Sequence, residues 1–259
     1  MWIDSHCHMD NVILNQNSEK IINECVNEGV NQIIIPSVSK ENFDKVINLA
    51  SKYKHCVYAL GIHPIYLKNF EDSDLDLLEY YLLNYNAVAV GEIGMDLFIQ
   101  KKNQCLQEHV FLSQLKIAKK FNLPVIMHVR GAIDLVLKNL RQIKVRGGIA
   151  HAFNGSFQQA DQLIKLGFKL GFGGAMTYPR AKHLQSLAKE LPIESIVLET
   201  DSPDMPPAWL NNGERNQPKE LGRIAEFFCH LRGLKPSKTA DIIRDNTIEA
   251  IPKLVELYT

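Results

Sequence analysis

Residues 87–93 read AVAVGEI, an almost unbroken apolar run, and residues 32–37 read QIIIPS in the same manner. Runs of this length are typical of parallel strands that are covered by other elements on both faces of a sheet. Similar β-rich segments recur along the whole chain. The eight predicted strands span residues 2–6, 32–37, 57–62, 87–93, 125–129, 148–152, 168–172 and 195–201.

Amphipathic segments lie between these strands. Segment 131–140 carries apolar residues at i, i+3, i+4 and i+7, which predicts a helix with one buried face. Segments 104–121 and 181–191 show the same kind of stripe, and a further helix is expected to begin at Ser18 and to end at Gly29. The strands recur every ~28 residues, which is the size of a βα unit.

Eight βα units in 259 residues predict an α/β protein with a single (β/α)8 TIM barrel, forming one domain over residues 1–259. A doubly wound open sheet is the alternative, because strand patterns alone do not show whether a sheet closes. No GxGxxG or Walker A pattern follows any predicted strand, so the commonest nucleotide-binding forms of that alternative are excluded.

The composition excludes several classes of protein. Lysine and arginine number 29 and aspartate and glutamate number 29, and this zero formal net charge argues against a protein that coats nucleic acid. Hydrophobic residues make up 46% and charged residues 22% of the chain, which excludes a disordered or fibrous protein. The five cysteines form no CxxC pair, and the N-terminal stretch MWIDSHCHMD lacks the features of a signal peptide, so we expect a cytoplasmic protein.

Side chains that bind metals gather at the ends of the predicted strands. His6 and His8 lie in DSHCHMD, and strand alternation places Asp4, His6 and His8 on one face, with Cys7 pointing away. In a barrel, the carboxyl ends of all strands open onto one mouth. The further residues of this kind are His63 in GIHP, Glu92 in GEIGMD, His128 in IMHVR, His151 in IAHAF and Asp201 in LETDSP.

One histidine at a strand end is usually a structural residue, but a set of imidazoles and carboxylates on different strands indicates a metal site. Such mixed ligands suit Zn²⁺, Mn²⁺, Fe or Co, and bind Mg²⁺ less strongly. Six ligand residues exceed the three or four that one open catalytic ion takes. Two ions about 3.5–4 Å apart, bridged by one carboxylate, fit that number better.

Six motifs, in order, carry a resemblance to a known family: DSHCHMD, GIHP, GEIGMD, LPVIMHVR, GGIAHAFNGS and VLETDSP. The sequence resembles the TatD family of metal-dependent hydrolases, which belong to the amidohydrolase-type barrels and include metal-dependent deoxyribonucleases. The resemblance extends from Asp4 to the NTIEA segment at Asn246. It implies a TIM barrel with a binuclear site, loaded with two divalent ions of Mg, Mn or Zn.

The resemblance also implies roles for the ligand residues. His6 and His8 match the pair that holds one ion, and Glu92 matches the carboxylate that bridges both ions. His128 and His151 match the ligands of the second ion.

Three more positions match the family's catalytic and substrate-side residues. Asp201 matches a ligand that also orients the attacking water, so Asp201 and Glu92 are the expected catalytic residues. His63 and Arg130 match residues on the substrate side. One loop departs from the family: HSRDA reads HVRGA here, with Val129 and Gly131 in place of a hydroxyl and a carboxylate.

We therefore expect a divalent-metal-dependent hydrolase that acts on phosphoester bonds through a metal-activated water, as a TatD-type deoxyribonuclease or phosphodiesterase. A phosphoester is the expected substrate, with single-stranded or frayed-end DNA as one candidate, and we expect no membrane and no obligate protein partner. One alternative is a C–N or carboxylic ester hydrolase of the amidohydrolase superfamily, whose members often bridge their ions with a modified lysine where this chain has Glu92. The other is a non-catalytic binding barrel that the metal stabilises.

Overall fold

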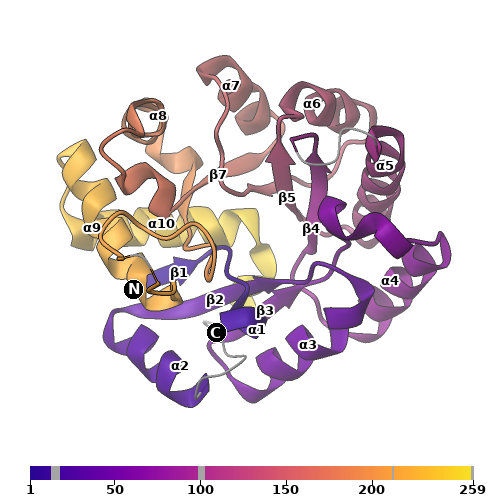
Figure 1. Cartoon of the computed structure of the whole chain (residues 1–259), viewed down its shortest axis with the longest axis horizontal. Helices are drawn as coiled ribbons and strands as arrows, with labels where there is room; N and C mark the ends of the chain where they lie inside the picture. The colour runs from indigo at the N-terminus through magenta and orange to yellow at the C-terminus, as the bar shows by residue number, and fades with distance from the viewer. Residues whose placement is uncertain (13–17, 99–102, 212, 258–259) are drawn as a thin grey trace.

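Strands and helices alternate along the chain in the computed structural model, which describes residues 1–12, 18–98, 103–211 and 213–257 (Figure 1). All eight predicted strands are present, with displaced ends at several of them. They are β1 (Trp2–Asp4), β2 (Val30–Pro36), β3 (Cys56–Ala59), β4 (Val90–Asp96), β5 (Val125–Arg130), β6 (Gly148–Ala150), β7 (Phe168–Phe172) and β8 (Ile196–Leu198).

Helices surround the strands (Figure 1). They are α1 (Met9–Val12), α2 (Ser18–Asn27), α3 (Phe43–Lys52), α4 (Ser73–Asn84), α5 (Gln104–Phe121), α6 (Ile133–Gln142), α7 (Phe157–Lys165), α8 (Lys182–Glu190), α9 (Leu221–Arg232) and α10 (Pro236–Ala250). Helix α5 has the bounds that its apolar stripe predicts. Helix α6 begins two residues later than predicted, because Gly131 has a φ of +66°, which a right-handed helix does not accommodate.

The strands are parallel and form two sheets, one of β1–β2–β3 and one of β4 to β8 in sequence order. Backbone hydrogen bonds join the sheets at both edges. At the first edge, Leu60 N–H donates to Ala89 and Gly91 N–H donates to Leu60. At the second edge, Ser5 N–H donates to Leu198 over 3.1 Å. The eight strands therefore form a closed ring, as the (β/α)8 prediction requires.

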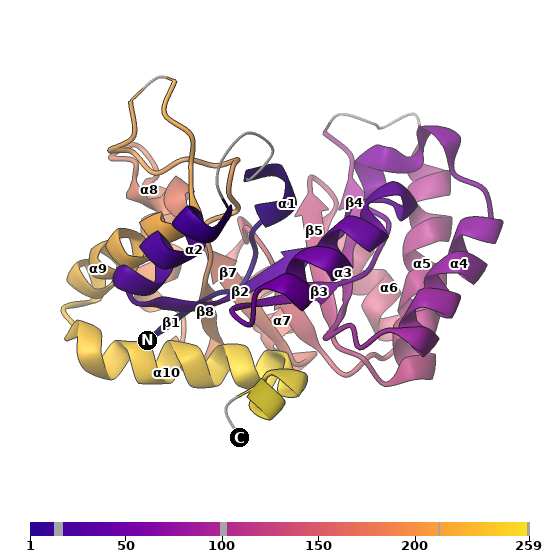
Figure 2. The same cartoon turned by 90° about the horizontal axis from the view of Figure 1, so that it is seen from below.

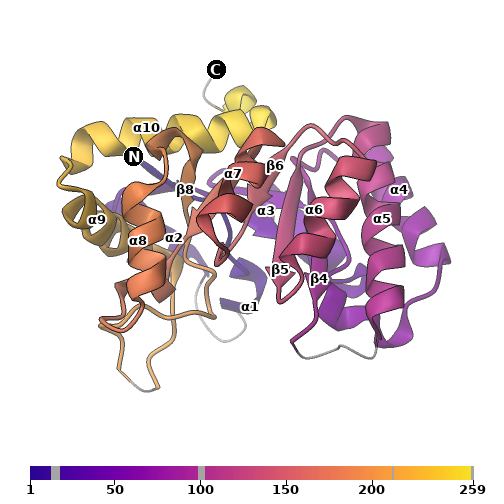
Figure 3. The same ribbon diagram turned by 90° about the horizontal axis from the view of Figure 1, so that it is seen from above.

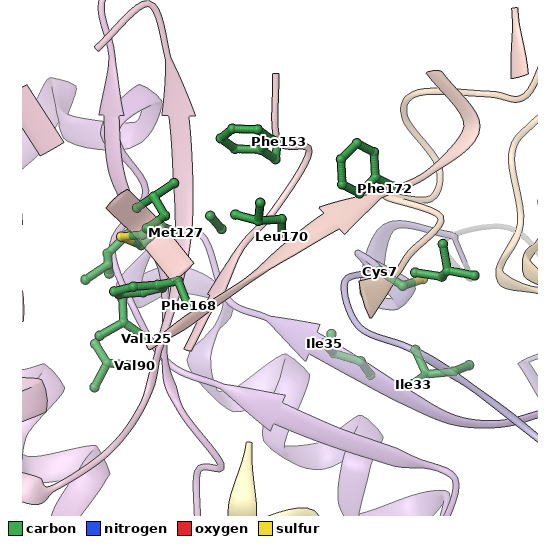
Figure 4. Close-up of a cluster of buried hydrophobic side chains, with 14 of the residues drawn as sticks. Cys7, Ile33, Ile35, Val90, Val125, Met127, Phe153, Phe168, Leu170 and Phe172 are labelled. Carbon is green, nitrogen blue, oxygen red and sulfur yellow. The ribbon is translucent and has the colours of Figure 1, made fainter. Parts of the chain in front are cut away.

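Two apolar clusters fill the molecule. The larger one lies between strands and helices, and Figure 4 shows part of it, with Phe168, Leu170 and Phe172 of β7 among its side chains. The smaller one combines inward-facing strand residues with the C-terminal segment, where Ile251 and Leu254 are fully buried. Its strand members are Ile3, Ile34, Val57, Ala59, Ile126, Ile149 and Val197, with Val88 and Ala89 just before β4.

The two ends of the barrel differ. Helix α10 lies across one end of the strands, and α1 and the segment after β8 project from the other (Figures 2 and 3). Ile251 and Leu254 fill the first end with apolar side chains. The carboxyl ends of the strands, where ligands bind in this architecture, are thus the open end. Among the described residues, no helix combines the length and apolar composition that a bilayer crossing requires.

Candidate metal centre

A pocket of about 550 Å³ opens at the carboxyl ends of the strands. Every sequence-predicted site residue lines it except His6, which is fully buried and lies within 3.6 Å of Glu92 and Asp201. The lining includes His8, His63, Glu92, His128, Arg130, His151 and Asp201. The structure therefore brings all eight predicted site residues to one place.

His6, His8 and Asp201 form one group whose ligand atoms are close enough together to hold an ion, and Glu92 lies beside both histidines. The atoms are His6 Nε2, His8 Nε2, Glu92 Oε2 and Asp201 Oδ1, and five of the distances between them are 3.3–3.7 Å. A tetrahedral ion with ligand distances of about 2.1 Å would separate its ligand atoms by about 3.4 Å. Glu92 Oε2 is buried and accepts no hydrogen bond from the described residues, although two imidazole nitrogens lie beside it. Lone pairs that converge in this way fit a bound cation.

The other oxygen of Glu92 faces a second group of histidines. Glu92 Oε1 lies 3.1 Å from His128 Nδ1 and 3.4 Å from His151 Nε2. Glu92 is 1% exposed, so neither oxygen is available to bulk solvent. One carboxylate thus presents separate oxygens to two imidazole clusters, which is the arrangement that a carboxylate bridging two ions needs.

His63 lies beside the second group but is unsuited to bind an ion. Its Nε2 lies 3.4 Å from Glu92 Oε1, and its Nδ1 accepts a hydrogen bond of 3.1 Å from Ile65 N–H. Burial lowers the pKa of His63, although the charge of Glu92 opposes this, so the ring is neutral. Because Nδ1 keeps its lone pair for Ile65, the single proton is on Nε2, which faces the site as a donor.

His6, His8 and Asp201 are held by the edge where β1 meets β8. The predicted strand 2–6 ends at Asp4, so the alternation that placed Asp4 on the face of His6 and His8 is wrong. Asp4 instead accepts hydrogen bonds from Thr200 Oγ1 at 2.5 Å and from the backbone N–H of Thr200 at 2.9 Å. Asp201 N–H donates to the carbonyl of His6 over 2.9 Å. Cys7 is buried in the larger apolar cluster, as its direction predicted.

Glu92 and His128 lie within their strands. The fourth strand begins three residues later than predicted and ends at Asp96. This shift brings the Asp96 carboxylate 3.2 Å from His128 Nε2. Burial lowers the pKa of His128, but hydrogen bonds to Asp96 and Glu92 outweigh it, and the pKa is raised. A carboxylate on the outer nitrogen fixes which nitrogen of a histidine faces a metal. This role of Asp96 was not predicted from the sequence, although the GEIGMD motif contains the residue.

His151 has a similar partner in Glu199. His151 Nδ1 lies 3.3 Å from Glu199 Oε1, which also accepts a hydrogen bond of 2.6 Å from Ala152 N–H. Strand β7 makes room for this carboxylate at Gly171, where a Cβ would lie 2.2 Å from Glu199 Oε2. In LETDSP, Glu199 lies two residues before Asp201, so strand alternation places both on one face, and this spacing is the signal for the role in the sequence.

The electrostatics of the cluster suit cation binding. Burial and the nearby His151 lower the pKa of His6 to about 4, so this ring stays neutral and keeps a lone pair. Burial alone would raise the pKa of Glu92, but electrostatic interactions with the surrounding imidazoles and a hydrogen bond with His128 hold it well below its usual value. Burial likewise opposes the ionisation of His151, yet the carboxylates of Asp201, Glu199 and Glu92 raise its pKa to about 10.

The sequence matches the family described as "TatD related DNase" over residues 3–252. The chain belongs to the TatD-related DNase family. A TatD relative from Escherichia coli K12, described as the uncharacterized metal-dependent hydrolase YjjV, is 39% identical over 251 residues, covering 95% of this chain and 96% of that protein. A Haemophilus influenzae protein described as an uncharacterized metal-dependent hydrolase is 34% identical over 261 residues, covering 96% of this chain and 97% of that protein.

A solved TatD structure has the same fold. The crystal structure described as YjjV, a TatD homologue from Escherichia coli K12, superposes with a TM-score of 0.92 at 37% identity, covering 97% of this chain and 98% of that one. The family match, the fold and the converging ligands agree with the resemblance in the six motifs. The chain is a TatD-type metal-dependent hydrolase.

Proposed function

We propose that this TatD protein hydrolyses phosphodiester bonds in single-stranded or frayed-end DNA, with two divalent ions of Mg, Mn or Zn. The observation that supports two ions is the division of the Glu92 carboxylate between the two imidazole clusters. Arg130, at the rim of the same pocket, supports a phosphate substrate because its guanidinium offers a planar fork of donors. The proposed unit of function is the single barrel of residues 1–259.

In this proposal, His6, His8 and Asp201 hold one ion, His128 and His151 hold the other, and Glu92 bridges them. Bound ions of this kind lower the pKa of water and stabilise charge on a phosphoryl group. Asp201 would accept the proton of the attacking water, because its Oδ1 lies 3.6 Å from His6 Nε2 and 3.7 Å from His8 Nε2, where the first ion would bind. His63 Nε2–H and Arg130 donate hydrogen bonds to the non-bridging phosphate oxygens.

The walls of the pocket support a substrate with a flat apolar group beside the phosphate. Phe153, Met176, Leu184 and Met205 line the side formed by the segments after β6, β7 and β8. Nucleobases stack on and pack against such side chains without demanding a particular sequence. The zero formal net charge of the chain supports a strand end as substrate, because tight binding of duplex DNA needs many cationic contacts.

A carboxylic ester or amide is the second candidate substrate. Val129 and Gly131 line the rim where the family's usual motif has a hydroxyl and a carboxylate, so this mouth offers fewer polar contacts. We also propose a reducing, cytoplasmic location, which is supported by the five cysteines: all are free thiols and four are buried.

The test is a substrate panel with metal-stripped protein that is reloaded with Mg²⁺, Mn²⁺ or Zn²⁺. Single-stranded DNA and a simple phosphodiester should be cleaved, and Glu92→Ala and Asp201→Ala should abolish cleavage while circular dichroism stays unchanged. Glu28→Ala, at an exposed carboxylate, is the matched control. Cleavage of only carboxylic esters or amides would replace the proposal with the second candidate. Stoichiometric metal uptake without any hydrolysis would indicate a binding barrel.

A further inference from the structure

Helix α5 carries two fully buried glutamines, Gln107 and Gln114. Residues seven apart lie on the same face of a helix, and this face points toward the barrel. A buried primary amide is costly unless both its oxygen and its nitrogen find partners. The partners of these two amides are backbone groups next to the candidate metal centre.

Gln107 holds the end of β4 by both of its amide atoms. Its Oε1 accepts a hydrogen bond of 2.8 Å from Asp96 N–H, and its Nε2 donates one of 3.0 Å to the Asp96 carbonyl. The Asp96 carboxylate in turn lies 3.2 Å from His128 Nε2, and His128 Nδ1 faces Glu92 Oε1. Gln107 therefore positions Asp96, whose carboxylate contacts His128 in the second imidazole cluster.

Gln114 holds the segment after β3 in the same way. Its Oε1 accepts a hydrogen bond of 2.8 Å from Ile62 N–H, and its Nε2 donates one of 2.9 Å to the Ile62 carbonyl. The next residue is His63, whose Nε2–H faces the mouth. Gln114 therefore sets the position of a substrate-side donor.

The first imidazole cluster is held by other contacts. His8 N–H donates to the Ser202 carbonyl over 2.8 Å, and Asp201 N–H donates to the carbonyl of His6. These bonds tie the end of β1 directly to the end of β8. A disturbance at the inner face of α5 should therefore leave the His6, His8 and Asp201 cluster in place.

We propose that Gln107 and Gln114 are positioning residues with separate effects, Gln107 on the second metal ion and Gln114 on substrate. This inference rests on the proposed two-ion function. Removing a partner behind a metal-binding histidine weakens metal binding by about 10- to 100-fold. Gln107 lies one contact further out, so we expect a loss of about 10-fold in affinity for the second ion.

Gln107→Met and Gln114→Met test the proposal, because methionine matches glutamine in shape and makes neither hydrogen bond. Titration of metal-stripped protein with Mn²⁺, followed by calorimetry and by the spin-coupled signal of a manganese pair, measures each ion separately. Gln107→Met should leave the first ion unchanged and weaken the second about 10-fold. Gln114→Met should leave both ions within two-fold of wild type and raise KM for a simple phosphodiester about 10-fold.

Asn246→Leu is the matched control. The Asn246 amide is also buried, but it donates to the carbonyls of Ile193 and Ile196, at the opposite end of the barrel from the mouth. This variant should lower Tm without changing either metal affinity or KM. If Gln107→Met fails to fold, Gln107→Glu, which keeps the size and the acceptors but loses the donor, should still weaken the second ion selectively.

Three results overturn the inference in distinguishable ways. Wild-type protein that takes up two Mn²⁺ ions, with Gln107 variants that bind both ions as tightly, would refute the inference and leave the proposed function intact. Wild-type protein that takes up only one ion would refute the two-ion function, and the inference with it. Equal effects of the Asn246 and Gln107 variants on the second ion would reduce both residues to general structural roles.

Discussion

Asp4 lies beside the candidate metal centre, but its hydrogen bonds connect two strands of the fold and not the groups of the site. The carboxylate is fully buried and accepts hydrogen bonds from both the side chain and the backbone of Thr200. Burial raises its pKa from 3.8 to about 8, even though those bonds favour the ionised form. A protonated Asp4 therefore joins β1 to β8 in the metal-free protein at neutral pH.

This pKa predicts how the stability of the metal-free protein depends on pH. Between pH 3.8 and about 8, the unfolded chain has lost the Asp4 proton while the folded chain keeps it. The contribution of Asp4 to stability is thus complete below pH 3.8 and is lost as the pH rises to about 8. Asp4→Asn, which is neutral at every pH, should flatten this part of the profile of unfolding free energy against pH. Asp76→Asn, at an exposed carboxylate, should not, and an unchanged Asp4→Asn profile would contradict the assignment.

At the scale of elements, periodicity and motif order predict the strands well and their ends poorly. The apolar runs place all eight strands, because a parallel strand covered on both faces needs such a run. The predicted alternation of side-chain directions from Asp4 to His8 failed. Strand β1 stops pairing at Asp4, and its backbone bends at Ser5 before the two histidines. The candidate ligands could be proposed because histidine or carboxylate motifs occur at the ends of six of the eight predicted strands.

The residues behind the ligands could not be predicted in the same way. Asp96 approaches His128 from the neighbouring strand β4, whereas Glu199 follows β8 and reaches His151 across β7. Both contacts depend on how the strands are aligned. The alignment of neighbouring strands cannot be read directly from a single sequence. Gln107 and Gln114 read simply as polar residues on an amphipathic helix, because burial of an amide is visible only when its backbone partners are in place.

The C-terminal segment that fills the closed end of the barrel gives a prediction about stability. Leu254 is fully buried in the smaller apolar cluster, whereas its neighbour Val255 is 47% exposed. Leu254→Ala should lower the free energy of unfolding by about 2–5 kcal/mol, because it leaves a cavity inside the ring of strands. Metal stoichiometry should stay the same, since the site lies at the opposite end. Val255→Ala should change stability by less than about 0.5 kcal/mol; equal effects in denaturant titrations would contradict this account.

For the molecule as a whole, binding of metal is coupled to protons and to stability. His151 has a pKa of about 10 in the metal-free protein, so it carries a proton at neutral pH that an ion must displace. Metal affinity should therefore rise with pH up to about 10. Calorimetric titration at pH 8 in two buffers of different ionisation enthalpy should give different heats, and identical heats would contradict proton release.

The loaded protein should also be harder to unfold. Each ion at 100 times its Kd adds about 2.7 kcal/mol to the free energy of unfolding, provided that it binds only the folded chain. A chelator should lower Tm accordingly, and re-addition of metal should restore it. Glu92→Ala, which removes the shared carboxylate, should lose most of this metal-dependent gain in Tm.

The edge where β1 meets β8 has a consequence for biosynthesis. His6 and His8 are translated long before Asp201, whose N–H donates a hydrogen bond to the carbonyl of His6. A nascent chain lacks the complete first cluster until the eighth strand has left the exit tunnel. A metal-dependent hydrolase built in this order has no complete candidate metal centre until Asp201 has been translated and has joined His6.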